Sequence, residues 1–201
     1  TALLSACGGG GTTDSLAGAD PIDRYVGTWT KKCDTWSAAD ISDMNGNGVS
    51  VIEVLKFEKA SATKANYTYT IKVFAHSDTT CSNQPIATLI KTGLNNNSTA
   101  TAGATMTTGF GTNELTYLGT QKLRIETVDK LQISEAKLTN IVGNVTVGGA
   151  IVNSGSPIFQ QYNIETLSKF KSDTQILLNS IDNGVIPDEM KDDEYMVLTK
   201  Q

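Results

Sequence analysis

The stretch Asn66-Tyr67-Thr68-Tyr69-Thr70-Ile71-Lys72-Val73-Phe74 decides the fold class, because its side chains alternate in character from Asn66 to Val73. Every second residue is apolar or aromatic: Tyr67, Tyr69, Ile71 and Val73. The residues between them are polar: Thr68, Thr70 and Lys72. Successive side chains of a β-strand point to opposite faces of the sheet, so this pattern predicts a strand with one buried face.

Similar short runs follow one another along most of the chain. The other predicted strands are 25–30, 51–57, 86–91, 99–108, 115–118, 123–128, 131–134, 142–152, 160–167, 175–180 and 194–200. Only residues 164–170 have apolar residues at helical spacing, and a strand is equally well supported there. Many short strands at roughly 8–12-residue spacing, with turn signals between them, indicate an all-β sandwich or barrel.

The net charge of the chain indicates which classes of partner it is not expected to bind. The chain of 201 residues has 16 basic and 21 acidic residues, for a formal net charge of −5 at pH 7. Nucleic acids and anionic membrane surfaces attract basic proteins, so neither is an expected partner of this acidic chain. Hydrophobic residues make up 39% of the sequence, which suits one domain with a packed core.

The N-terminal residues indicate a tethered protein. Leu4-Ser5-Ala6-Cys7 resembles a bacterial lipobox, in which a signal peptidase cuts before the cysteine and the thiol carries a diacylglycerol. Four glycines follow Cys7 and supply a flexible tether. The resemblance implies a signal-peptide remnant at 1–6, a lipidated cysteine with its tether at 7–22, and one β domain at 23–201. It places the protein in the bacterial cell envelope, as an outer-membrane lipoprotein. An unstructured segment with an unmodified cysteine is the alternative.

Lipidation of Cys7 leaves Cys33 and Cys81 as the two other cysteines. An even remainder in an exported protein predicts a disulfide between them, and two separate buried thiols are the alternative. A zinc site is disfavoured, because neither cysteine belongs to a C-x-x-C pair and the chain has a single histidine.

Both ends of the predicted domain resemble a known family. Gly27-Thr28-Trp29 resembles the Gly-x-Trp signature of lipocalins and of lipocalin-like bacterial lipoproteins, and residues 195–200 are similar to the closing strand of such domains. The resemblance implies an antiparallel up-and-down β-barrel whose tryptophan plugs the closed end, with a β-sandwich as the alternative. The ligand-binding residues that we assign to the barrel mouth are Trp29, Leu55, Tyr67 and Tyr69.

One motif raises the question of a metal. Asp43-Met44-Asn45-Gly46-Asn47-Gly48 resembles the start of an EF-hand loop, but the twelfth position, which needs a glutamate, is Val54. An Asn/Gly turn that leads into the next strand is the simpler interpretation. A weak Ca²⁺ site remains an open alternative, with the ligands Asp40, Asp43, Asn45 and Asn47. No cofactor and no other metal is expected.

The sequence offers little catalytic machinery. His76 follows the alternating strand, where a solvated histidine is the simplest interpretation. The sequence has no G-x-S-x-G elbow, no G-x-G-x-x-G run and no Walker lysine. The carboxylates at 188–189 and 192–194 surround Lys191 as in a solvated loop. We therefore assign no catalytic residue and expect a protein that is not an enzyme.

Two functions remain as working hypotheses. The first is an envelope lipoprotein whose β-barrel binds a small apolar or amphiphilic ligand. The alternative is a tethered protein-interaction or adhesion module at the cell surface. A packed interior together with an exposed apolar patch would favour the second. A hydrolase with an unfamiliar site is a distant third.

The lipobox generates the first testable prediction. In the native host, Cys7→Ser is expected to release the domain in soluble form, because an acyl chain contributes about 0.8 kcal/mol of membrane affinity per buried methylene. Fractionation of cells that carry either version measures this, and Ser5→Thr, a change inside the tetrad that keeps the thiol, is the control. A Cys7→Ser protein that stays firmly in the membrane fraction contradicts the prediction.

Overall fold

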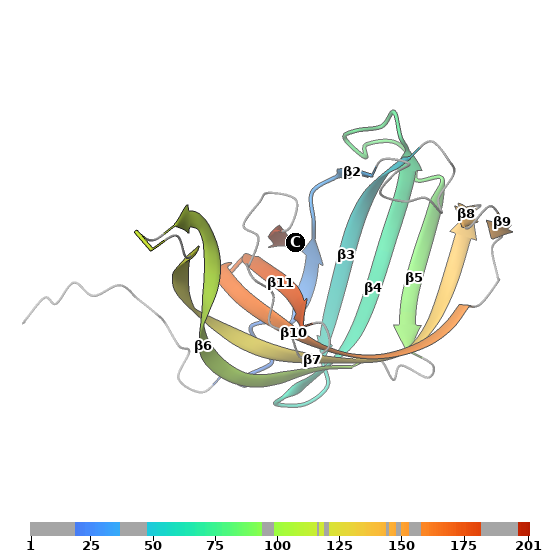
Figure 1. The fold of residues 1–201 in the computed structure, drawn as a ribbon. Helices are drawn as coiled ribbons and strands as arrows, with labels where there is room; N and C mark the ends of the chain where they lie inside the picture. Colours follow the sequence, from blue (N-terminus) through green and yellow to red (C-terminus); the bar gives the residue numbers. More distant parts are fainter. Residues whose placement is uncertain are drawn as a thin grey trace, which may run out of the picture.

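The computed structural model describes residues 19–36, 48–93, 99–115, 117–118, 121–143, 145–147, 150–152, 158–181 and 197–201. Within these ranges the regular elements are β-strands, and every pairing between them is antiparallel (Figure 1). The all-β antiparallel fold class predicted from the sequence is therefore confirmed.

The strands are β1 (Gly27–Thr30), β2 (Asp34–Trp36), β3 (Val49–Lys59), β4 (Lys64–Ala75), β5 (Ala87–Gly93), β6 (Thr99–Leu115), β7 (Gln121–Gly143), β8 (Val145–Val147), β9 (Ala150–Val152), β10 (Ile158–Ser172), β11 (Gln175–Ile181) and β12 (Val197–Lys200). β8 and β9 form a small separate ribbon, and the other strands belong to one sheet.

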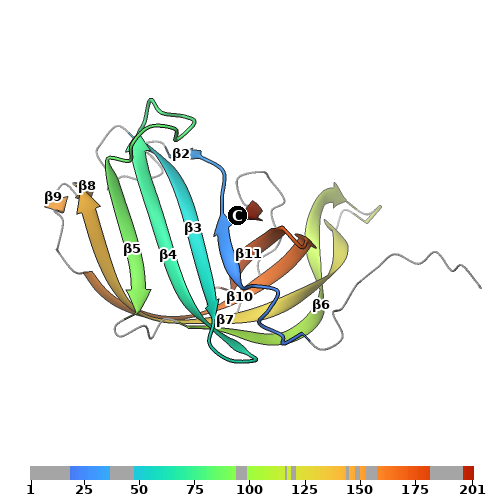
Figure 2. The ribbon, with the colours of Figure 1, turned by 180° about the vertical axis from the view of Figure 1, so that it is seen from behind.

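That sheet closes into a barrel-like ring of 8 strands. The hydrogen-bonded order is β3-β1-β12-β11-β10-β7-β5-β4, and β4 pairs again with β3. Because each pairing is antiparallel, neighbours around the ring alternate up and down, as Figures 1 and 2 show from opposite sides. β5 and the first residues of β6 share one position, since β5 pairs with β4 at Tyr69–Val73 and β6 pairs with β4 at Lys64–Asn66.

The two ends of the ring differ. One end, called here the Tyr25 end, carries the turn that precedes β1, the end of β3 and the start of β4. The other end, called the disulfide end, carries the start of β3, the end of β4 and the Cys33–Cys81 disulfide. The two cysteines are 48 residues apart in the sequence, and their pairing confirms the sequence prediction.

The interior of the ring is packed at the Tyr25 end. The buried residues of this Tyr25 cluster are Ile22, Tyr25, Trp29, Leu55, Phe57, Ala65, Tyr67, Ala100, Leu131, Ile133, Ile176 and Leu198. They come from strands all around the ring, so the face that they share is the inward one. Trp29 is 0% exposed, and its indole N–H donates to the backbone oxygen of Tyr25 at 2.6 Å. The Phe170 ring lies edge-on to the rings of Tyr25 and Trp29.

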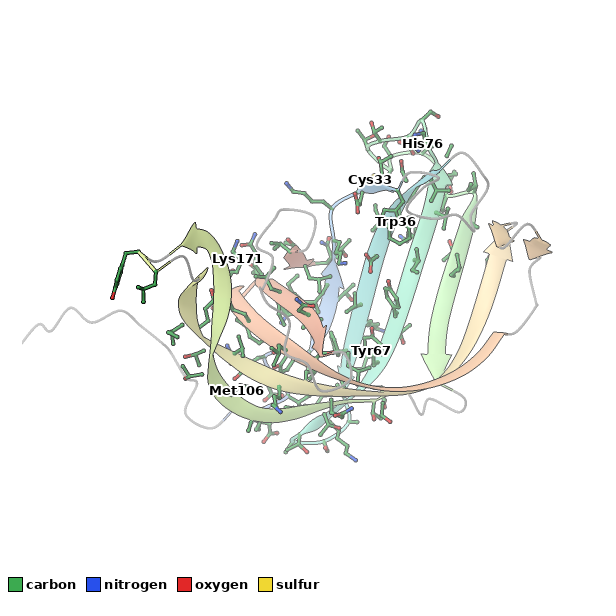
Figure 3. All side chains as sticks on the ribbon, in the orientation of Figure 1. Cys33, Trp36, Tyr67, His76, Met106 and Lys171 are labelled. Carbon is green, nitrogen blue, oxygen red and sulfur yellow. A yellow bond between two sulfur atoms is a disulfide. The ribbon has the colours of Figure 1, made fainter. Side chains whose placement is uncertain are left out.

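A smaller cluster lies inside the ring at the disulfide end. Its buried residues are Val49, Val51, Ile71, Val73, Ala87 and Leu89, from β3, β4 and β5. Trp36 of β2 packs against them, and Figure 3 shows this side chain beside Cys33, at the end of the ring that carries His76. The alternation of 66–74 therefore contributes to both interior clusters.

A third cluster, the outer cluster, lies on the outside of the ring. Leu177 and Val197 alternate with the inward-facing Ile176 and Leu198, so they point outward. The part of β6 that follows Thr105 and the part of β7 that precedes Asp129 form a hairpin, which folds back over this outer face. Met106 and Val128 of the hairpin pack there with Leu167. The Glu126 and Lys169 side chains, 3.0 Å apart, join the hairpin to β10 by an ion pair. Around Leu167, Leu177 and Val197, the strands β10, β11 and β12 are thus covered on both faces.

Most predicted strands differ from the observed ones in length, but two predictions were wrong: 117–118 form a turn after β6, and the run at 142–152 is divided among the end of β7, β8 and β9. The runs at 51–57 and 66–74 fall within the longer strands β3 and β4. The Thr/Ala/Gly-rich run at 99–108 is the first half of β6. The runs predicted separately at 123–128 and 131–134 are parts of the single strand β7. Residues 164–170 belong to strand β10 and do not form the helix considered as an alternative.

The packing of the Tyr25 cluster gives a stability prediction. Trp29→Ala is expected to lower the free energy of unfolding by about 3–5 kcal/mol, like other large-to-small changes in a core. Urea unfolding monitored by circular dichroism measures this. Trp36→Ala is the matched control, because Trp36 is only partly buried, and it should lower the free energy of unfolding by less. Equal losses for the two variants would contradict a structural role specific to Trp29.

A candidate binding site inside the ring

Three polar side chains lie on the inward face of the ring where the two interior clusters meet. Glu53 is on β3 between Val51 and Leu55, which belong to different clusters. Lys31 follows β1, and its backbone N–H donates to the Glu53 backbone oxygen at 3.0 Å. Tyr69 is on β4, opposite Leu55 in the β3–β4 register. We call Lys31, Glu53 and Tyr69 the polar trio.

The trio is linked through the Glu53 carboxylate. Lys31 Nζ donates to Oε1 at 2.8 Å, and the Tyr69 hydroxyl donates to Oε2 at 2.5 Å. The lysine and glutamate side chains are 20% and 16% exposed, so they are largely but not completely withdrawn from water. Each carboxylate oxygen therefore has a donor, and the pair carries no net charge.

The environment of Tyr69 limits what its hydroxyl can do. Burial raises its pKa far above the usual value, and the nearby charge of Glu53 raises it further. The hydroxyl stays protonated at physiological pH and acts as a hydrogen-bond donor. A phenol in this state is neither a nucleophile nor a base, so Tyr69 contributes a hydrogen-bond donor to the trio.

The trio can also bind a polar group from outside the protein. An ammonium has three N–H donors, and the contact with Glu53 uses one of those of Lys31. Carboxylate oxygens accept more than one hydrogen bond each. Next to these groups is the apolar disulfide-end cluster, with Val51 and Ile71 closest along the strands. The arrangement presents polar groups at one level of the ring and an apolar lining beside them.

The residues assigned to ligand binding from the sequence lie together on the inward face, but most of them are packed. Trp29, Leu55 and Tyr67 are 0%, 6% and 7% exposed and contribute to the Tyr25 cluster. Tyr69 is half-buried and belongs to the trio. These three side chains therefore have almost no exposed surface, and Tyr69 is the one of the four that is only partly buried.

Lys31 and Glu53 were missed in the sequence. The signal for Glu53 was its inward position within 51–57, where a charged residue interrupts an apolar face. Lys31 comes after the end of the predicted strand, and nothing in the sequence marks it as the partner of a residue on another strand.

The other candidate residues lie elsewhere. His76 is exposed in the turn after β4, as predicted. Some candidates lie outside the described residues. They are Cys7, the carboxylates at 188–194, and the Ca²⁺ ligand candidates Asp40, Asp43, Asn45 and Asn47. Among the residues that the structure describes, no group of three or more His, Cys, Asp or Glu side chains is placed to hold a metal ion.

A second polar network has a structural role at the Tyr25 end. The Tyr25 hydroxyl and Ser168 Oγ are 2.6 Å apart, and Asp129 of β7 accepts from Arg24 at 2.8 Å and from Thr105 at 2.5 Å. The Arg24 guanidinium also lies 4.0 Å from the centre of the Phe170 ring. These contacts fasten the turn before β1 to β6, β7 and β10.

No protein-family model, curated protein or solved structure matches this chain. In the described part of the chain, no helix has the length and apolar character needed to cross a bilayer.

The buried tyrosines predict a loss of stability at alkaline pH. Burial raises the pKa of Tyr25 from 10.0 to about 12, and it raises the pKa values of Tyr67 and Tyr69 further. The unfolded chain releases these protons near pH 10 while the folded protein retains them. The three groups therefore add stability that is complete below pH 10 and declines as the pH rises above it.

Tyr69→Phe removes one of these groups. Between pH 10 and the raised folded-state pKa, the fall in unfolding free energy with pH is expected to become less steep by about 1.4 kcal/mol per pH unit. Urea unfolding at a series of alkaline pH values measures the slope. Tyr117→Phe is the control, because Tyr117 is 95% exposed. An unchanged slope in Tyr69→Phe would contradict the prediction.

Proposed function

We propose that this protein is a non-enzymatic envelope lipoprotein whose barrel-like ring binds one small amphiphilic ligand. The observation that carries the proposal is the polar trio, which lies inside the ring between two apolar clusters and keeps partial access to water. Barrels of about eight strands can hold one small ligand in their interior.

The two interior clusters support a directional mode of binding. Both interior clusters are buried, but the Tyr25 end holds the large aromatic side chains and the disulfide end holds smaller aliphatic ones, so we place the ligand on the disulfide-end side. A ligand whose polar group meets Lys31 and Glu53 can place its apolar part against the Val51–Ile71 side of the ring. This arrangement favours an amphiphile over a wholly apolar molecule, because an apolar ligand would displace water from the Lys31 ammonium and the Glu53 carboxylate and offer no hydrogen bond in exchange.

Two features, the closure of the ring and the burial of Trp29, support the lipocalin-like interpretation. Trp29 of the Gly-x-Trp segment is fully buried in the Tyr25 cluster, as expected of a tryptophan that plugs one end of a barrel. The N-terminal lipobox supplies the membrane anchor and the bacterial outer membrane as the location. Ring closure and the buried tryptophan support the family assignment, which stays part of the proposal.

A titration with uncharged, cationic and anionic twelve-carbon amphiphiles tests the proposal, using dodecanol, dodecylamine and dodecanoate below their aggregation limits. Saturable one-to-one binding of at least one of them is expected, with a change in Trp36 fluorescence because Trp36 packs on the disulfide-end cluster. Native mass spectrometry of protein purified from its own membrane shows independently whether a ligand mass remains bound. Absence of saturable binding and of any ligand mass contradicts the proposal.

Matched variants locate the binding site. Lys31→Met is expected to weaken binding by about tenfold or more, because the head group loses a charged hydrogen-bond donor. Lys56→Met is the control, since Lys56 is on the outward face of β3 and pairs with Glu58 at the surface. Circular dichroism confirms that both variants are folded. Equal effects of the two substitutions would place the ligand outside the ring.

A further inference from the structure

The β6–β7 hairpin is the most exposed apolar part of the described structure. Its tip carries Tyr117 and Leu118, which are 95% and 72% exposed, and Ile125 on β7 is 66% exposed. In Figures 1 and 2 the hairpin stands at one side of the ring, away from β5 and β8. One face of the hairpin packs in the outer cluster through Met106 and Val128. The exposed Tyr117, Leu118 and Ile125 are not part of that packing.

The hairpin also has an open strand edge. Near its start, β6 pairs on one side with β4 and on the other with β7. The last hydrogen bond on the β4 side is from the Ala102 N–H to the Thr63 oxygen, at 2.9 Å. From Gly103 onward, no described strand pairs with that edge, while pairing with β7 continues to Leu115. Backbone N–H and C=O groups along this edge are directed away from the hairpin.

The sequence of this edge lacks charged residues and proline, two of the usual protections against strand pairing. Proteins protect exposed edges with lysines, prolines, bulges or very short strands. The residues at 99–113 include no charged residue and no proline. Register shifts occur between Ala102 and Thr105 and between Gly111 and Leu115, and between them Thr105–Gly111 runs in regular register with β7. This regular segment is long enough to accept another strand.

We propose that Thr105–Gly111 of β6 pairs antiparallel with the same segment of a second copy of this chain, across a two-fold axis. Such a pairing continues the β-sheet of each copy into the other, and each backbone group then meets a group of the opposite kind. A segment without charge is self-complementary, because the two copies bring no like charges together. The exposed Tyr117, Leu118 and Ile125 lie on the same hairpin and add apolar area beside the new strand pair.

The expected dimer is weak. Stable interfaces bury roughly 1,200–2,000 Å² in total, and a strand pair of this length with a few apolar side chains falls at or below the lower limit. The dissociation constant is therefore expected in the micromolar range, about 1–100 μM. For a chain held on a membrane surface, confinement raises the effective concentration and favours the dimer.

Sedimentation velocity on the full chain over a range of micromolar concentrations tests the proposal. Cys7→Ser is the background, so that a disulfide between two tethers does not produce a dimer of another kind. Thr107→Lys and Thr107→Glu are each expected to raise the dissociation constant about tenfold or more, since the two copies of residue 107 lie close to the axis. Mixing the two variants should restore a heterodimer at least as tight as the original dimer.

Thr127→Lys is the matched control. Thr127 is exposed and directly opposite Thr107 in the β6–β7 register, so the same charge is placed one strand away from the proposed interface. Its dissociation constant should change by no more than about threefold. A chain that stays monomeric at all concentrations overturns the proposal. So does equal weakening by Thr107→Lys and Thr127→Lys, or failure of the mixed variants to form a heterodimer.

Discussion

The closure of the ring depends on the short strand β1. It is the only described strand between β3 and β12, and its pairing with β12 is limited to Trp29 with Lys200 and Thr30 with Thr199. A seam with so few backbone hydrogen bonds needs side-chain packing to hold it. Trp29 supplies it: the indole is fully buried, is hydrogen-bonded to the Tyr25 backbone and packs against Phe170. The Lys200 ammonium lies 5.2 Å from the centre of the same indole.

The difference between the two ends of the ring follows from where this seam ends. Beyond Thr30 the chain has no further register with β12, while Lys31 keeps a backbone hydrogen bond to Glu53. β2 continues along β3 and, among the described strands, pairs with no other. The Cys33–Cys81 disulfide ties this segment to the turn after β4, where Asp78 accepts hydrogen bonds from the backbone N–H groups of Ser82 and Asn83. The polar trio lies between the β1–β12 pairing, which is held by side-chain packing, and the β2 segment, which is held by the disulfide.

Features that depend on neighbouring residues could be predicted from the sequence. The alternation of 66–74 gave β4 and its inward face, and cysteine parity gave the disulfide. The length of β7 was missed, because Asp129 and Lys130 resemble a turn; Asp129 is stabilised inside the strand by Arg24 and Thr105, which are distant in sequence. The outer cluster had one overlooked signal. Ile176-Leu177-Leu178 is a continuous apolar run, as expected of a strand that is buried on both faces.

Stability alone does not account for the polar trio. Withdrawing a lysine and a glutamate from water is unfavourable, and apolar residues of similar size are often as stable or more stable in such places. Lys56 and Glu58 on the outward face of the same strand form their ion pair at the surface, with side chains 50% and 58% exposed, and so avoid that penalty. The inward position of Glu53 is surrounded by residues that would pack well with a leucine or valine. A charged, hydrogen-bonded group retained there at an energetic cost supports the proposal that a molecule with a polar group binds inside the ring.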